Sequence, residues 1–503
     1  MHVERELKFR LAAASASRVW SLVPRPAPVR RRVLESVYYD TADRRLRAAR
    51  AALRLRRDGH RWLICFKRDA APASGLAQRH EWEVKVARRA LAVDALPLAE
   101  IRATAGIDLR PLAPRLAPVF STRFTRRSSE AVLAGGTRLE LCVDRGSIAA
   151  GRRRAPIQEL ELELVAGDLA GMLDFAERLV EPLRLELEPL SKAERGYRLA
   201  ARERAAPVKW RCPPLTKGGS VEEAMCAVLE ACLAQVEANL YGVAHATDPE
   251  YLHQLRVGMR RMRSALRVFE GLGPRDVFRA PAAGLREFMP ELGAARDWDV
   301  FCARLGEVAR AEGTDAPQPA RLLRSARTRR AAARKAARAL AGSPRMQRFL
   351  LGIMRWMHEA RWRANPTIEP KPVRSLTRYA EHALARQERR VLRLGAKADW
   401  TDASQRHRLR IRVKRLRYAC EPFAALYGQA RARRYLERLE SLQDILGELN
   451  DIAVGRRLLA ELRSGRGDPE AEFMRGWFAA REGHLVAQLG GAWGAWRKTM
   501  SPW

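Results

Sequence analysis

The sequence lacks the features of membrane-spanning, secreted and disulfide-bonded proteins. No stretch approaches the roughly 18 consecutive apolar residues that a transmembrane helix needs. Charges begin at Glu4, so the first residues do not have the basic segment and apolar core of a signal peptide. The seven cysteines include no CxxC pair, and their odd number argues against a disulfide framework. We therefore expect a cytoplasmic protein with reduced, mostly buried cysteines and no membrane partner.

Acidic residues are few beside the basic ones. The 503 residues include 94 Lys and Arg against 58 Asp and Glu, a formal net charge of +36. A field of this sign attracts polyanions such as nucleic acid, polyphosphate or anionic lipid. The joint abundance of alanine and arginine also fits a GC-rich coding sequence without any functional demand, so the placement of the charges must decide. The length, with a hydrophobic content of 47%, predicts two or more globular domains.

The first 200 residues have the pattern of a β-rich domain, which we place at 1–203. Apolar and polar residues alternate in six segments, 3–9, 52–57, 61–67, 81–86, 138–144 and 158–164. Asp58-Gly59 and Gly135-Gly136 are typical of hairpin turns, and helical spacing predicts one helix over 168–183. Many antiparallel strands joined by hairpins indicate a barrel or a sandwich.

Proline and glycine gather in residues 204–219, which we interpret as a linker to an all-α domain at 220–503. This helical part repeats itself. HQLRVGMRRMR at 253–263 matches HRLRIRVKRLR at 407–417, and LGAARDWDV at 292–300 matches LGELNDIAV at 446–454. Both pairs are 154 residues apart. The common offset predicts an internal duplication with copies at about 220–375 and 376–503.

Each copy carries a basic stripe along one helical face, separate from the apolar face. A solvated surface is the ordinary role of such a stripe, but neither stripe has an acid to offset repulsion between neighbouring cations. Because Arg and Lys bind phosphate oxygens through charge-assisted hydrogen bonds, we predict a polyanion site here. Each histidine either donates to phosphate or bonds a neighbouring carboxylate. The predicted site residues are His253, Arg256, Arg260, Arg261, Arg263, His407, Arg410, Lys414, Arg415 and Arg417.

The doubled H-x-x-R-x-x-x-[RK]-R-x-R helix, each copy followed by an LGxxxD segment, resembles the CHAD domain, the conserved-histidine α-helical domain. The resemblance covers roughly 218–465. It implies two pseudo-symmetric four-helix units around a basic channel, and binding of long-chain inorganic polyphosphate. Asp297 and Asp451 would orient basic side chains. Asn450 stands where the first copy has Arg296, so the halves need not contribute equally.

The polar faces of the expected strands divide into acidic and basic sets. Glu159, Glu161 and Glu163 share one face, as do Glu4 and Glu6 in another strand. Arg54 and Arg56 share a basic face, and Lys67 ends a further strand. Carboxylates so close together repel each other unless cations lie among them. A closed barrel lined by both sets would hold a divalent metal on one side and phosphates on the other.

This half resembles the CYTH family of triphosphate tunnel metalloenzymes. Its ExExK signature is Glu4-Arg5-Glu6-Leu7-Lys8, and YYDTADRRLRAARAALRLRR (38–57), STRFTRR, ELELEL (159–164) and SKAERGY (191–197) follow in family order. The resemblance implies an eight-stranded antiparallel tunnel and metal-dependent hydrolysis of triphosphates. The implied catalytic residues are Glu4, Glu6 and Lys8. The implied metal ligands are Glu4, Glu6, Asp144, Glu161 and Glu163, with Glu159 as a substitute if the register slips. The implied phosphate-binding residues are Lys8, Arg54, Arg56, Lys67, Arg123 and Lys192.

The sequence thus predicts a multidomain α+β protein that hydrolyses inorganic triphosphate with Mg²⁺ or Mn²⁺ and binds polyphosphate, and that associates with polyphosphate granules. A ligand carboxylate or Lys8 would accept the proton of the attacking water. One alternative is hydrolysis of a nucleoside or thiamine triphosphate, or cyclisation of ATP, with Trp62 or Trp82 as a platform for the base. Another is a binding protein without catalysis. We do not expect nucleic acid as a partner, since no recognised module for it is present. The oligomeric state stays open.

Overall fold

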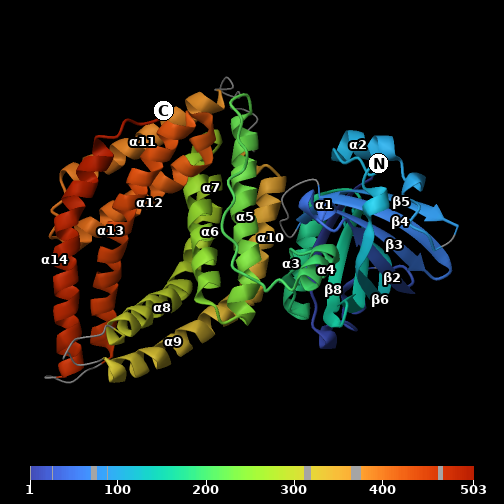
Figure 1. The fold of residues 1–503 in the computed structure, drawn as a ribbon, viewed down its shortest axis with the longest axis horizontal. Coiled ribbons are helices and arrows are strands. Elements are labelled where there is room, and N and C mark those ends of the chain that lie inside the picture. Colours follow the sequence, from blue (N-terminus) through green and yellow to red (C-terminus); the bar gives the residue numbers. More distant parts are fainter. Residues whose placement is uncertain are drawn as a thin grey trace. The chain divides into compact units, whose positions relative to one another are not determined.

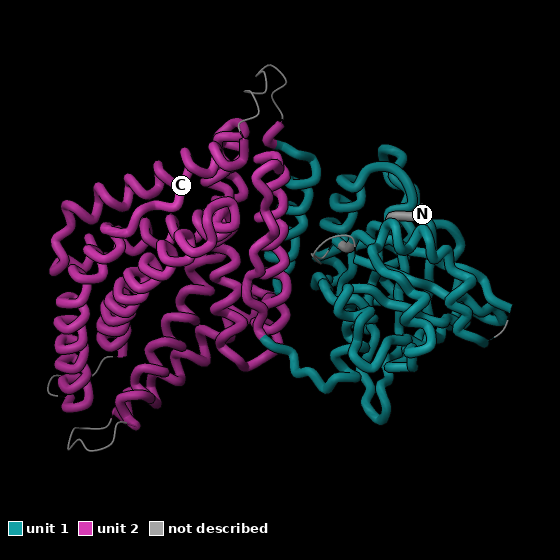
Figure 2. Tube along the Cα trace, turned by 45° about the horizontal axis from the view of Figure 1, so that its top comes forward, with its two compact units in different colours: residues 1–206, 342–361 teal, residues 207–341, 362–503 magenta. Residues whose placement is uncertain are grey.

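The computed structural model describes residues 2–24, 26–69, 76–87, 89–310, 319–363, 375–462 and 468–503. The chain forms two compact units, Met1–Ala206 with Gly342–Arg361, and Pro207–Ala341 with Trp362–Trp503 (Figure 2). We call them the barrel unit and the helical unit. The barrel unit therefore includes a helix from late in the chain, which periodicity alone assigns to the helical part. No helix among the described residues is long and apolar enough to cross a membrane.

The barrel unit is a closed antiparallel barrel (Figure 1). Its strands are β1 (His2–Arg10), β2 (Arg30–Asp40), β3 (Ala51–Asp58), β4 (Arg61–Asp69), β5 (Leu76–Val86), β6 (Ala117–Val132), β7 (Arg138–Ala150) and β8 (Arg153–Ala166). The strand order is β5-β4-β3-β2-β6-β7-β8-β1, and pairing of β1 with β5 closes the ring. The two-residue strand β9 (Glu186–Leu187) also pairs with β1. The predicted eight-stranded antiparallel tunnel fold is confirmed, although the six alternating segments did not reveal β2 and β6.

Helices cover the outside of the barrel. They are α1 (Arg45–Ala48), α2 (Leu98–Ala105), α3 (Leu169–Leu183), α4 (Lys192–Ala201) and α10 (Pro344–His358). The outer side chains Leu53, Phe66 and Trp82 join a buried cluster with Ile101 of α2. Helix α3 packs on β8 and α10 packs on α3, so α10 is an outer layer of this unit. The Gln347 side chain of α10 also accepts a hydrogen bond from the Leu187 backbone N–H at 3.0 Å.

Helix α4 closes one end of the barrel. Its first turn is capped by the Ser191 hydroxyl, which accepts a hydrogen bond from the Glu194 backbone N–H at 3.1 Å. Tyr197 of α4 enters a buried cluster with inward aromatic residues that include Phe120. A Cβ at Gly196 would lie 2.1 Å from the Phe120 ring, so only glycine permits this close approach.

The helical unit repeats its helices as the duplication predicts (Figure 1). The first copy contains α5 (Val221–His245), α6 (Pro249–Val268), α7 (Arg275–Glu287), α8 (Met289–Ala309) and α9 (Ala320–Ala341). The second contains α11 (Leu376–Ala396), α12 (Ala403–Phe423), α13 (Gln429–Glu461) and α14 (Pro469–Arg497). Helices α6 and α12 pack on each other, as do α8 and α13.

Even the helix caps recur at the 154-residue offset. Asp248 caps α6 and Asp402 caps α12, each accepting from the backbone N–H two residues later. The two copies differ in one helix, since α13 is continuous where the first copy is divided into α7 and α8. Pro290 lies at the start of α8, and a proline cannot donate the hydrogen bond that would continue α7. Of the seven cysteines, Cys65, Cys142, Cys232, Cys302 and Cys420 are buried, as predicted.

Candidate active site and basic helix cluster

Both faces of strand β1 are buried from Glu6 to Phe9. Glu4, Glu6 and Lys8 are 5%, 4% and 2% exposed. Leu7 and Phe9, which alternate with them, are 0% exposed on the other face. The polar face of this strand therefore does not lie in water but lines the inside of the barrel.

Cross-strand register brings the acids of three neighbouring strands together. The rows across β1, β8 and β7 are Glu6–Glu163–Glu140, Lys8–Glu161–Cys142 and Arg10–Glu159–Asp144. We use the name acidic wall for Glu4, Glu6, Asp144, Glu159, Glu161 and Glu163. These are the six predicted metal ligands, and the structure places all of them on the inner face of adjacent strands.

At the α4 end of the acidic wall, three buried carboxylates surround one lysine. Asp144, Glu159 and Glu161 each offer an oxygen, and these oxygens lie within 4.8 Å of one another. Lys192 Nζ lies 2.7 Å from Asp144 Oδ2 and 2.8 Å from Glu161 Oε1, and it also contacts Glu159. Burial alone would raise the pKa of Glu161, but Lys192, Arg126 and Lys8 together outweigh it and hold that pKa well below its usual range.

Arg126 of β6 binds the same carboxylates from the neighbouring strand. Its Nε lies 2.8 Å from Asp144 Oδ1 and its Nη2 lies 2.7 Å from Asp144 Oδ2, a bidentate pair. The same Nη2 also contacts Glu161. Arg195 Nη1 lies 2.7 Å from Glu159 Oε2, so three cations balance the three acids at this end.

At the other end, the acids outnumber the cations near one residue. Lys67 Nζ lies 2.7 Å from Glu4 Oε2, and Arg79 pairs with Glu6. Burial would raise the pKa of Glu6, but Lys8 and Arg79 lower it to about 2. Glu163 has no such partner among the described residues. Burial and the neighbouring Glu4 raise its pKa to about 8. The neighbouring cations therefore do not offset the cost of a negative charge on this carboxyl.

The facing strands and the first residue of helix α4 carry a basic wall, which we define as Arg54, Arg56, Lys67, Arg79, Arg126 and Lys192. Lys67 Nζ lies 2.9 Å from Glu81 Oε2, and Arg54 lies 3.7 Å from the same side chain. Although burial opposes it, these two cations lower the pKa of Glu81 to about 2. Arg56 pairs with Glu83 at 3.2 Å. Inside the barrel, one side is therefore mainly acidic and the facing side is mainly basic, with Glu81 and Glu83 among its cations.

The structure does not bring Arg123 to this site, contrary to the sequence expectation. Arg123 lies on the outer face of β6, where its Nε is 3.1 Å from Glu35 Oε1 and its side chain is 76% exposed. Arg126, three residues later, faces inward because side chains in a strand alternate. Arg79 is a second cation in the site that is missing from the predicted phosphate-binding residues. Phe120, Phe124 and Arg126 share one face of β6. The sequence alone does not show that this face points inward, because that depends on how β6 pairs with its neighbouring strand.

The donors of the acidic wall suit a hard divalent cation. They are carboxylate oxygens, all except Glu163 belong to buried side chains, and three of them converge within 4.8 Å. Oxygen ligands of this kind are those that Mg²⁺ and Mn²⁺ prefer, often shared with phosphate. A bound cation would also offset the repulsion between Glu163 and Glu4, which helps to raise the pKa of Glu163.

The helical unit has its own cluster where α6 meets α12. The charged groups that face Lys414 are Arg256, Arg260 and His253 of α6, Arg410 of α12, and Asp444 and Asp451 of α13. Burial, Arg410 and Arg260 lower the pKa of Lys414 to about 6. Burial and Arg260 lower the pKa of Arg256 to about 10. Cations that disfavour each other's charge in this way would gain from a bound anion.

The predicted residues of the basic stripes are not all in this central cluster. Arg256, Arg260, Arg410 and Lys414 are brought together. Arg263 and Arg415 lie further along, near Arg267. Arg261 and Arg417 instead pair with Glu421 of α12.

The two histidines also differ. Burial and Arg296 lower the pKa of His253 to about 4, whereas His407 Nδ1 lies 2.8 Å from Asn450 Oδ1. The two histidines therefore have different neighbours, because Asn450 stands in the second copy where the first copy has Arg296. Asp297 Oδ2 lies 3.6 Å from Arg457 Nη2.

Comparisons with known proteins match both halves. The family model of the CYTH domain matches residues 2–197 and that of the CHAD domain matches residues 227–460. An inorganic triphosphatase from Haemophilus influenzae is 31% identical over 177 residues, which are 34% of this chain and 47% of that protein. The chain thus spans about half the length of this curated relative. A crystal structure of the CHAD domain from the plant Ricinus communis is 32% identical, covers 59% of this chain and 99% of that chain, and has a TM-score of 0.52. The chain therefore carries a CYTH domain followed by a CHAD domain.

Proposed function

We propose that this protein hydrolyses inorganic triphosphate to pyrophosphate and phosphate with Mg²⁺ or Mn²⁺, and that its helical unit binds inorganic polyphosphate. The observation that carries the first part is the pairing of an acidic wall with a basic wall inside one closed barrel. A linear polyanion with a divalent cation is the ligand that matches both walls. The similarity to an inorganic triphosphatase supports the same substrate.

Each wall has a defined part in the proposed reaction. Glu4, Glu6 and Glu163, together with the carboxylates near Lys192, would hold the metal, which neutralises phosphate charge and polarises the phosphoryl group when bound. Lys67, Arg54 and the other cations of the basic wall would hold the phosphates. Because these cations are buried and already fixed by carboxylates, they need little reorganisation to stabilise charge on the transferred group. The reaction would be a direct attack of water.

Inorganic triphosphate suits the barrel better than a nucleotide. The two tryptophans considered as platforms for a base both lie outside. Trp82 packs in the outer cluster with Phe66, and its Nε1 donates to Glu100 of α2 at 3.1 Å. Trp62 alternates with the inward Cys65 and therefore faces outward as well. A base would find neither ring inside the barrel.

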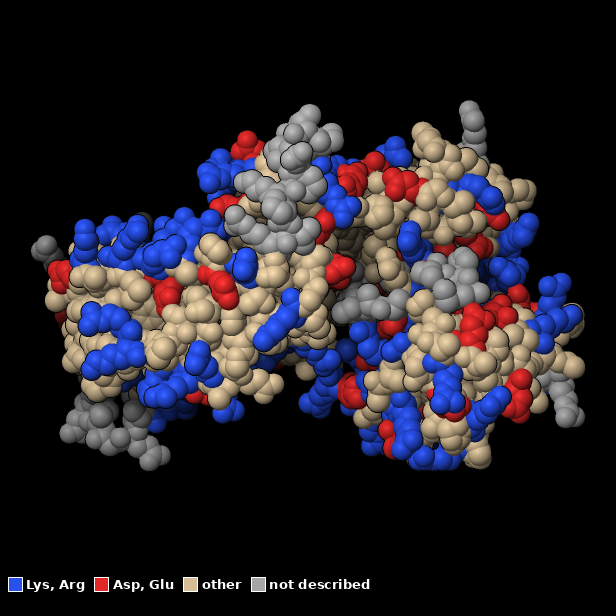
Figure 3. Space-filling view, turned by 90° about the horizontal axis from the view of Figure 1, so that it is seen from above, with Lys and Arg blue, Asp and Glu red and all other residues tan. Residues whose placement is uncertain are grey.

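The proposed polyphosphate site is the central cluster of the helical unit. Arg256, Arg260, Arg410 and Lys414 come from both copies and converge where α6 crosses α12. The Nε atoms of Arg260 and Arg410 are buried without a hydrogen-bond partner among the described residues. Figure 3 shows lysine and arginine side chains gathered along one margin of the helical unit, at the left of the view. Such a surface would draw a polyanion toward the site.

Phosphate release by the purified full chain tests the catalytic proposal. Tripolyphosphate, ATP, thiamine triphosphate and long-chain polyphosphate would each be offered with Mg²⁺, with Mn²⁺ and with a chelator. We expect metal-dependent release that is fastest from tripolyphosphate, and a loss of about 100-fold or more in Glu4→Gln and Glu6→Gln. Arg145→Met, which changes an exposed residue on the outer face of β7, is the control for altered charge. No release from any substrate, combined with tight polyphosphate binding, would instead indicate a binding protein.

A further inference from the structure

The two copies of the basic helix diverge at their C-terminal ends. The stripe of α6 consists of Arg256, Arg260, Arg263 and Arg267, which span roughly 16 Å of one helical face. The equivalent positions of α12, each 154 residues later, hold Arg410, Lys414, Arg417 and Glu421. The α6 stripe therefore remains basic to its end, whereas the α12 stripe ends in an acid.

Glu421 neutralises the cations around it. Its Oε2 accepts a hydrogen bond from Arg261 Nη2 at 2.8 Å, and its Oε1 lies 3.1 Å from Arg417 Nε. Arg417 Nη2 also lies 2.7 Å from Glu440 Oε1. The guanidinium of Arg261 packs over Trp210, 4.9 Å from the ring centroid. On this side the arginines thus have protein partners in place of an anion.

The equivalent side of α6 is open and basic. A groove of about 210 Å³ lies among α6, α11 and α12. Its lining includes Ser264, Arg267, Arg390, Arg412, Arg415 and one acid, Glu270. We call it the arginine groove. Burial and the neighbouring Arg267 lower the pKa of Arg415 to about 10.

Helix packing also differs between the two sides. Arg412 of α12 takes the position that Gly258 has in α6. A Cβ at Gly258 would lie 3.0 Å from Val236 Cγ2, so α5 packs closely on α6 at this point. In the second copy a guanidinium occupies the corresponding position and lines the groove.

Arg263 connects the groove to the central cluster. Burial lowers its pKa to about 10, together with Arg267 and Arg286 and then Arg260 of the central cluster. Its Nε is buried and has no hydrogen-bond partner among the described residues. A run of cations therefore continues from Arg260 through Arg263 into the groove.

We propose that the arginine groove is a phosphate subsite that extends the polyphosphate site of the helical unit on one side, while Glu421 closes the equivalent side. The inference rests on the proposed polyphosphate binding and adds a direction to it. A chain bound at the central cluster continues past Arg263 to Arg267, Arg412 and Arg415. It does not continue past Arg417.

One matched pair of variants tests the direction. Arg263→Gln and Arg417→Gln remove one charge from equivalent positions of the two copies. Binding of long-chain polyphosphate to the full chain would be measured at several salt concentrations. We expect Arg263→Gln to weaken binding at least about tenfold and to lower the salt dependence, because it loses a charge-assisted phosphate contact. Arg417→Gln stays within about twofold, since Glu421 and Glu440 already occupy that side chain. Equal losses in both variants would overturn the proposal.

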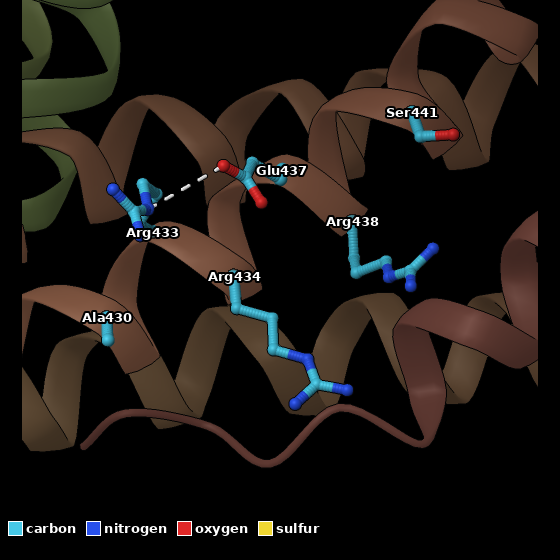
Figure 4. Close-up of a pocket in the computed structure, with 6 residues that line it drawn as sticks. All are labelled: Ala430, Arg433, Arg434, Glu437, Arg438 and Ser441. Carbon is cyan, nitrogen blue, oxygen red and sulfur yellow. Dashed lines mark ion pairs between the residues drawn. The ribbon is translucent and has the colours of Figure 1, made fainter.

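A second pair tests the groove itself. Arg412→Gln/Arg415→Gln removes two groove charges, and Arg434→Gln/Arg438→Gln removes two charges from α13. Figure 4 shows Arg434 and Arg438 extending from α13 into an open pocket, where Arg433 pairs with Glu437 at 3.8 Å. The groove variant should weaken binding at least about tenfold and the α13 variant less than about twofold. The same small effect in both variants would refute the subsite.

A third variant separates this inference from the proposed function. Arg256→Gln/Arg410→Gln removes two cations of the central cluster. If the wild type does not bind polyphosphate, the proposed function of the helical unit fails. If the central variant loses binding while Arg263→Gln and Arg412→Gln/Arg415→Gln keep the wild-type affinity, the proposed function holds. The proposal that the arginine groove binds phosphate is then wrong. Thermal melting of every variant would show that the fold is retained.

Discussion

Lys192 is the residue whose removal the structure predicts most sharply. Its side chain is 9% exposed, and its Nζ contacts Asp144, Glu159 and Glu161. In Lys192→Met these three buried carboxylates keep only Arg126 and Arg195 as ion-pair partners among the described residues. Removing one partner of a buried ion pair costs about 3–5 kcal/mol in free energy of unfolding. For a unit of this size that corresponds to a fall of roughly 6–20 °C in the melting midpoint.

The dependence on pH and on metal follows from the same contacts. Lys192 is the cation that lowers the pKa values of Glu159 and Glu161 most, so without it burial raises both pKa values in the folded state. The variant then regains stability as the pH falls through the raised pKa values, so its deficit should be largest at neutral pH and above. Mg²⁺ or Mn²⁺ should restore part of the loss, because the cation supplies the missing positive charge.

Calorimetric melting at pH 7.5 and pH 5.5, each with chelator and with Mg²⁺, would measure this. Lys192→Arg keeps the charge and should melt within a few degrees of the wild type. Arg145→Met loses an exposed charge and should change the free energy of unfolding by less than about 0.5 kcal/mol. The reasoning is refuted if Lys192→Met melts like the wild type, or if Mg²⁺ raises the melting midpoint of both proteins equally.

Three further predictions follow from other parts of the molecule. Arg126→Gln should lower triphosphate hydrolysis by about 100-fold and Arg123→Gln by less than about twofold in a phosphate-release assay. The reverse ranking would mean that Arg123, and not Arg126, faces the inside of the barrel. Gly196→Ala should lower the free energy of unfolding by about 1–3 kcal/mol, because its Cβ meets a ring at 2.1 Å, whereas Gly352→Ala, with nothing within 4 Å, should not be destabilising in the same melting experiment. Polyphosphate binding at pH 7.5 should take up a proton at Lys414, whose pKa is about 6 when free, so affinity falls as the pH rises from 6 to 8. Calorimetry in two buffers of different ionisation heat would detect this uptake, and Lys414→Arg should abolish it.

The acidic wall could be predicted from the sequence because it depends on local periodicity. Glu159, Glu161 and Glu163 alternate with leucines that must be buried, so their common face is determined by the strand alone. Arg123 and Arg126 show the limit of this reasoning. They lie in one short run with arginines at both parities, and only the register against β7 decides which one faces inward.

The helical unit shows the same limit over a longer distance. The stripe containing Arg261 looks uncompensated within its own helix, but its acid, Glu421, is 160 residues away in sequence. A sequence pattern shows only the charges along one helix, whereas the acid that pairs with an arginine can belong to the neighbouring helix. The domain limits at 203 and 220 stay a prediction, and periodicity could not have separated α10 from the helices around it.

The position of α10 has a consequence for how the protein is made. The ribosome must synthesise residues 207–341 after the barrel strands have emerged and before α10 becomes available. At about 5–20 residues per second, these roughly 135 residues take about 7–27 s. During that interval the nascent barrel has α3 without its outer layer, so a chaperone that binds exposed helices would find a site there that disappears once α10 has left the ribosome and packed on α3.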